Sequence, residues 1–296
     1  MFKSVSRQVC AFDLEWGPDP ASGRRLYGLP RTMADTDVFE VMWEKAGATA
    51  EKPRPHLKTA LCRVLAVSAV IREVQNDGAI ALRLTSLPRQ IDQLMDEGEL
   101  IATFLGYLGQ HRPQLVGFKS HTMDLPILLQ RGLVAGISAA EFCRSTDQGR
   151  GRDYFSRYSD THIDLKQTLS GWGIATPTLH ELAAAMGIPG QVEAEPPRVV
   201  DWWVEGDVRA IATQSQYDAL STYLVWLRTA RFAGFFSHDQ YIEEEDRWRA
   251  MVGDRIAQGN HHLSPYLDQW TRWQIQPPDT AVVPLAAPAE VTEQAA

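Results

Sequence analysis

The stretch QVCAFDLEWGPD, residues 8–19, decides the fold and points to a site. Its apolar run predicts a strand over residues 8–15 that ends in acidic residues. Side chains two apart on a strand point to the same face, so Asp13 and Glu15 lie side by side. Among apolar neighbours, two like charges are costly unless a cation neutralises them, and oxygen ligands favour Mg²⁺ or Mn²⁺. A strand end that exposes both acids to water is the alternative.

A second strand pair follows this stretch. Residues 61–73 and 79–86 are strand-like, and the turn Asn76-Asp77-Gly78 between them predicts a hairpin. The intervening residues 17–58 are rich in Pro, Gly and charge, and we interpret them as an insertion or long loop with a short helix near 37–45. The first three strands therefore belong to one sheet.

Helical periodicity dominates the rest of the chain, apart from a short strand predicted at 114–118. Helices are predicted at about 90–110, from Pro126 onward, and at about 163–171, 178–186, 207–231 and 237–257. This order predicts an α/β fold, a mixed sheet flanked by helices. We assign residues 1–232 to one domain, 233–276 to a C-terminal helical extension and 277–296 to a flexible tail.

Composition excludes several classes of protein. The 296 residues are 44% hydrophobic and 22% charged, which is typical of a globular chain. The apolar run 65–71 is far shorter than the about 20 residues of a membrane span. The first residues lack the apolar core of a signal peptide, so we expect a cytoplasmic protein without membrane contact. A net charge of −8 argues against a protein that coats duplex DNA, but not against an acidic metal site.

Two further acids stand out by position. Asp124 follows the strand at 114–118 and precedes Pro126, where an acid can simply complement the helix dipole. Asp218 lies within the helix at 207–231 beside an apolar stripe, which is expensive unless the carboxylate is paired, metal-bound or exposed. Together with the pair on the first strand, these acids can converge at one sheet edge. That is the layout of a two-metal phosphodiester hydrolase.

Three segments resemble the exonuclease motifs of the DEDD superfamily. They are AFDLEWGPD at 11–19, GFKSHTMDLPILLQRGL at 117–133 and QYDALSTYLVWLR at 216–228. The chain is most similar to the bacterial group of predicted 3′→5′ exonucleases related to the proofreading domain of family B DNA polymerases, over about 8–231. The resemblance implies an RNase H-like fold and metal-dependent removal of nucleotides from a 3′ end.

The resemblance also assigns roles to residues. Asp13, Glu15, Asp124 and Asp218 would be catalytic carboxylates that hold two Mg²⁺ or Mn²⁺ ions. The family places a Tyr four residues before the last Asp or a His five before it, whereas this chain has Gln214 and Thr213. An amide can hydrogen-bond a water but has no useful basicity, so Gln214 is the water-orienting candidate of an enzyme expected to be slow.

Substrate contacts are expected around the second motif. Lys119 and Ser120 replace the family's Asn-Gly, and with His121 they are the substrate-binding candidates. The expected partner is single-stranded DNA or another 3′ end, with RNA left open. The alternative function is an exonuclease-like domain that binds nucleic acid or a protein without cutting. Residues 17–58 or the C-terminal segment would then provide a docking element.

Overall fold

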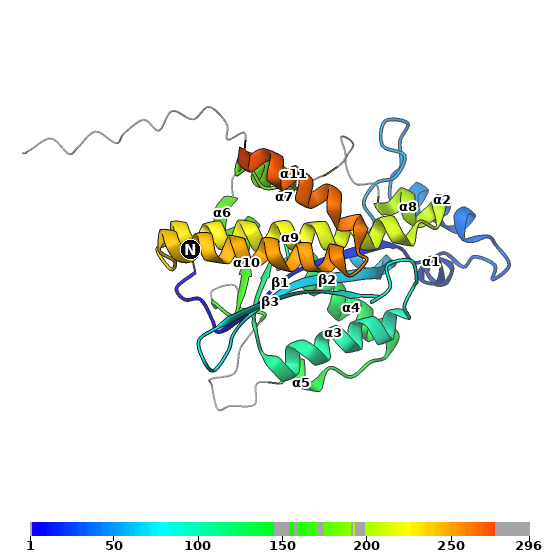
Figure 1. Ribbon diagram of the computed structural model, residues 1–296. Coiled ribbons are helices and arrows are strands. Elements are labelled where there is room, and N and C mark those ends of the chain that lie inside the picture. The colour runs from blue at the N-terminus through cyan, green and yellow to red at the C-terminus, as the bar shows by residue number, and fades with distance from the viewer. Residues whose placement is uncertain are drawn as a thin grey trace, which may run out of the picture.

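The central feature of the molecule is a five-stranded mixed sheet (Figure 1). The computed structural model describes residues 2–144, 154–156, 159–170, 175–190, 192 and 199–275. The strands lie in the order β3-β2-β1-β4-β5, with β1 antiparallel to β2, β2 antiparallel to β3, and β4 parallel to both β1 and β5. Their bounds are β1 Gln8–Pro18, β2 Cys62–Val74, β3 Ile80–Leu87, β4 Gln114–Gly117 and β5 His162–Asp164. This topology is RNase H-like and confirms the predicted α/β class.

Helices cover both faces of the sheet (Figure 1). One face carries α9, α10 and α11, and the other carries α3, α4 and α5. Their bounds are α3 Glu97–His111, α4 Asp124–Ala135, α5 Ala140–Cys143, α9 Val208–Phe232, α10 His238–Ala257 and α11 Ser264–Ile275. Alternate residues of β1 serve the two cores: Val9 and Ala11 pack with α9, whereas Cys10 and Phe12 pack with α3 and α4. Asp13 continues the first set and so faces α9.

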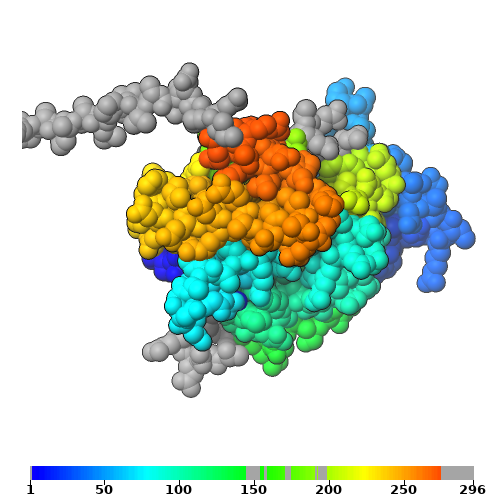
Figure 2. Space-filling model, in the orientation of Figure 1, coloured from blue at the N-terminus to red at the C-terminus, as the bar shows by residue number. Residues whose placement is uncertain are grey.

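The 17–58 region is more ordered than a long loop. Strand β1 continues to Pro18, and Asp19 then caps α1 Pro20–Tyr27 by accepting backbone hydrogen bonds from the first turn. Helix α2, Asp35–Lys45, agrees with the predicted short helix, but α1 was not expected. The two helices project from one end of the molecule, next to α8 Val199–Glu205 (Figures 1 and 2).

Buried ion pairs fasten the outlying helices to the domain. Arg131 of α4 is 2% exposed and contacts Asp19 at 2.9 Å and Glu97 at 2.6 Å, which joins the start of α1 to α3 and α4. Arg72 of β2 contacts Glu244 of α10 at 2.7 Å, again in the interior. Breaking a buried pair leaves an uncompensated charge, so both contacts hold their helices firmly.

Two predicted helices begin later than expected. The periodicity at 90–110 becomes helical only at Glu97, because Asp96 caps α3 through the backbone N–H of Glu99. The segment predicted as a helix at 163–171 starts as β5, since His162 and Asp164 pair with β4, and α6 Leu165–Ser170 follows. Helix α7 Leu179–Ala185 and helix α9, which Asp207 caps through the Ala210 N–H, agree with the predicted ranges. The predicted tail lies outside the described residues.

Candidate functional site

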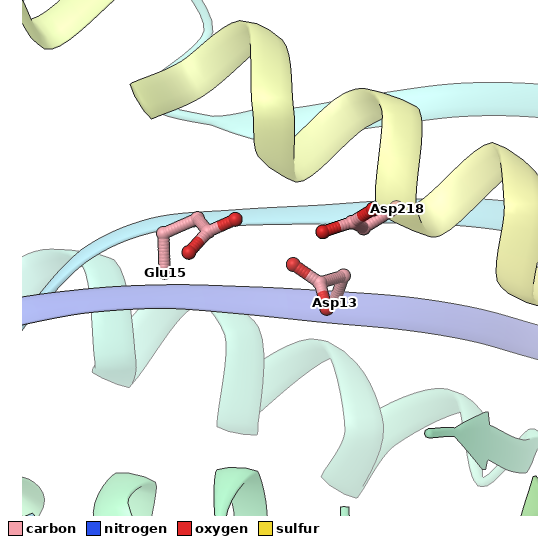
Figure 3. A group of neighbouring side chains, drawn as sticks. All are labelled: Asp13, Glu15 and Asp218. Carbon is pink, nitrogen blue, oxygen red and sulfur yellow. The ribbon is translucent and has the colours of Figure 1, made fainter. Parts of the chain in front are cut away.

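Three carboxylates converge between β1 and α9. Asp13 and Glu15 point from the strand toward the helix, and Asp218 points back from α9 (Figure 3). Each offers one oxygen that lies within 4.8 Å of an oxygen of the other two. The local cause is periodicity: residues two apart share one face of β1, and Asp218 lies on the side of α9 that packs on the sheet. An all-oxygen donor set of this kind suits a hard divalent cation.

The electrostatics of the group are unfavourable without a cation. Burial raises the pKa of Asp13 well above its ordinary value, and the charges of Glu15, Asp218 and Asp124 raise it further. Burial and neighbouring acids raise the pKa of Glu15 in the same way. In the described part of the chain, no basic side chain contributes to either shift. The charge of these acids is therefore uncompensated by the residues around them, and a divalent ion would remove the repulsion.

Asp124 stands at the first position of α4 and is 4% exposed. It is not one of the three carboxylates whose oxygens meet, among the described residues searched. Burial, then Asp164 and Asp218, raise the pKa of Asp124, whereas the Lys119 ammonium lowers it. Asp124 therefore lies within electrostatic range of the trio, at its margin, with a cationic side chain nearby.

Gln214 lies one turn before Asp218 on α9 and is 7% exposed. Burial raises the pKa of Asp218 to about 7, and a hydrogen bond from the Gln214 side chain lowers it. The Gln214 amide therefore lies close to the Asp218 carboxylate and favours its charged form. Tyr217 does not replace a tyrosine at position 214, because it lies about 100° around the helix from Asp218 and its phenol donates to the His262 carbonyl at 2.5 Å.

The turn at 119–121 is held by β5. The backbone N–H groups of Lys119 and His121 donate to the two Asp164 carboxylate oxygens, at 2.9 and 3.0 Å. Lys119 has a φ of 65°, a conformation that non-glycine residues rarely adopt. The two hydrogen bonds to Asp164 stabilise this backbone conformation of Lys119. Lys119 itself is exposed, and its side chain is the one that acts on Asp124.

His162 supports the same turn from the side. Its Nδ1 lies 3.1 Å from the Tyr154 carbonyl and so carries the proton, which leaves Nε2 to accept from the Ser120 hydroxyl at 2.8 Å. The His121 ring packs on His162 with centroids 4.0 Å apart. Ser120 is fully buried, so its side chain serves the turn's conformation, whereas His121 is partly exposed.

The sequence does not predict that His162 and Asp164 lie in a strand. Asp164 precedes a helix in the sequence, which favours either a first-turn acid or a support for the metal site. In the structure it caps α6 through Gln167 N–H and also binds the 119–121 turn. The signal for β5 is only three residues long, too short for a strand pattern.

Fold and site together define an RNase H-like domain with a carboxylate group on its first strand and late helix. The family model for predicted 3′–5′ exonucleases related to the exonuclease domain of PolB matches residues 54–270, and the chain belongs to that family. The match includes Asp124 and Asp218, while Asp13 and Glu15 precede it and are linked to the site by geometry. A search of curated proteins gave no match. No helix in the described residues is long and apolar enough to cross a membrane.

Proposed function

We propose that the protein is a divalent-metal-dependent 3′→5′ exonuclease that acts on single-stranded DNA or frayed 3′ ends. The observation that carries the proposal is the meeting of the Asp13, Glu15 and Asp218 carboxylates on the α9 face of β1. Buried acids that raise one another's pKa values are costly to stability, and such costs are typical of functional sites.

The donor set fits Mg²⁺ or Mn²⁺ in two sites. Asp13, Glu15 and Asp218 would hold one ion, and Asp124 would complete the second site with Asp13. When bound, such ions favour deprotonation of the attacking water and neutralise charge that builds up on the phosphate. The second site is the less complete of the two, because Asp124 lies at the margin of the group.

The chain's own residues would orient the reactants. The Gln214 amide N–H group would face Asp218, and its carbonyl oxygen would accept a hydrogen bond from the attacking water. The water oxygen forms a bond to phosphorus, the bond to the 3′ oxygen breaks, and the water's proton ends on the released 3′ hydroxyl. Lys119 is exposed and near Asp124, where its ammonium would attract the phosphate backbone.

A second function is favoured by the same glutamine. An amide cannot take a proton from water, and general-base help is worth roughly 10²–10⁴-fold in rate. A domain that binds a 3′ end or a protein partner without cutting is therefore the alternative. RNA would be distinguished from DNA only by contacts to the 2′ hydroxyl.

The test is a timed digestion of 5′-labelled single-stranded DNA with Mn²⁺ or Mg²⁺. We expect a ladder that shortens from the 3′ end with the native protein and no ladder with Asp13→Ala. A native protein that leaves DNA intact, beside a Gln214→Tyr variant that produces the ladder, would instead favour the binding function. An equal ladder from native protein and Asp13→Ala would refute the carboxylate site.

A further inference from the structure

A polar pocket lies beyond the 119–121 turn, along the outer edge of β5. Its volume is about 350 Å³, within the size range of small-ligand sites. Its lining comes from the N-terminal segment, the turn, the approach to β5, β5 itself and α6: Phe2, Lys3, His121, Ser159, Asp160, His162, Ile163, Asp164, Gln167 and Thr168. The pocket shares His121 and Asp164 with the machinery around Asp124.

The polar groups of the pocket favour a neutral ligand. Asp164 already accepts from three backbone N–H groups, and Asp160 accepts from the Lys3 N–H at 2.7 Å and from the Ser4 hydroxyl. Two carboxylates against the single ammonium of the described lining, that of the exposed Lys3, disfavour a phosphate inside the pocket. Among the contacts of the described residues, the Gln167 amide and the Thr168 hydroxyl make no hydrogen bond, and both side chains are partly exposed.

These groups match the chemistry of a nucleobase. An amide and a hydroxyl supply donors and acceptors for a base edge. The His121 ring, backed by His162 at 4.0 Å between centroids, offers an aromatic wall of the kind on which unpaired bases stack. Because β5 fixes the backbone of the turn, this wall stands in a defined place relative to Asp124.

We infer that this pocket is a subsite for a base of the substrate strand upstream of the cleaved bond. The inference rests on the proposed exonuclease function and adds the residues that hold the strand. Gln167 and Thr168 would contact the base edge, His121 would stack on the base, and the adjoining phosphates would stay outside, near Lys119. The turn then links base binding to the position of Asp124.

The inference is tested with two substrates that differ in the upstream nucleotides. The p-nitrophenyl ester of thymidine 5′-monophosphate carries only the nucleotide to be released, whereas a single-stranded oligonucleotide also fills the pocket. We expect the double variant Gln167→Met/Thr168→Val to raise KM for the oligonucleotide about tenfold, as expected for loss of hydrogen bonds to one base edge, while kcat/KM for the ester stays within twofold. The matched control is Gln110→Met/Thr103→Val, on exposed positions of α3.

Binding supplies a readout that does not need cleavage. The probe is an oligonucleotide that carries fluorescein at its 5′ end and has a free 3′ end. Its anisotropy should report a Kd about tenfold weaker for the pocket variant and unchanged for the control. Equal losses with ester and oligonucleotide, or an unchanged Kd, would overturn the subsite. If native protein cleaves neither substrate, the exonuclease proposal fails, and the Kd comparison still decides whether the pocket binds the strand.

Discussion

Replacement of Asp218 by Asn should stabilise the metal-free protein in a pH-dependent way. Burial raises the pKa of Asp218 to about 7 from its ordinary 3.8, so the folded state favours the protonated form. Stability is then lost as pH rises from the unfolded pKa to the folded pKa. The loss is about 1.4 kcal/mol per pH unit and stops once the pH exceeds the folded pKa of about 7. Between pH 5 and pH 8 it therefore amounts to about 2.6 kcal/mol. Because Asp218 is partly exposed, we expect about 2 kcal/mol.

The assay is urea unfolding of native protein and Asp218→Asn in EDTA at both pH values. The difference in free energy of unfolding between variant and native should shift in favour of the variant by about 2 kcal/mol from pH 5 to pH 8. Because the same substitution is measured at both pH values, any pH-independent effect of the introduced amide on stability cancels from the comparison. Addition of Mn²⁺ should stabilise the native protein more than the variant, because a ligand of the folded state adds to its stability. A pH-independent difference would show that burial does not raise the pKa of Asp218 in the folded protein.

Three further changes test the framework of the site. Arg131→Met should lower the free energy of unfolding by about 3–5 kcal/mol, since Glu97 is left buried without its partner, and a loss below about 1 kcal/mol in urea unfolding would contradict this. His162 has a pKa lowered by burial to about 3, so acid stability should improve in His162→Gln. The native protein should lose about 2 kcal/mol more than the variant between pH 7 and pH 5, and parallel curves would rule this out. Gly117→Ala places a Cβ 2.5 Å from the Ser120 side chain; we expect a loss of about 1–3 kcal/mol and slower nucleotide release, and native-like values of both would argue against a tightly held turn.

Long elements with a clear period could be predicted from the sequence. The strand around Asp13, the hairpin at 61–86 and the helix that carries Asp218 all lie where their patterns indicate. The meeting of three of the four predicted carboxylates, Asp13, Glu15 and Asp218, follows from the alternation of side chains along β1 and the position of α9. These features depend on local periodicity, which the sequence records directly.

Short elements and through-space contacts could not be predicted. Strand β5 has three residues, and its neighbours favour a helix, so only pairing with β4 reveals it. Helix α8 depends on tertiary packing: the Trp203 indole N–H donates to the Pro18 carbonyl at 3.0 Å, and Gly17 leaves the space that the ring occupies. The sequence likewise cannot predict that Asp124 lies farther from Asp13, Glu15 and Asp218 than these three lie from one another.

The most direct test of the account is a Mn²⁺ titration followed by electron paramagnetic resonance, on native protein and on Asp13→Asn. Asp13 lies in the carboxylate group and would serve both ions. We expect native protein to bind two Mn²⁺ ions, and the variant to lose the ion held by Asp13, Glu15 and Asp218 together with the magnetic coupling between the two ions. Absence of bound Mn²⁺ at millimolar concentration, or identical titrations of the two proteins, would contradict it.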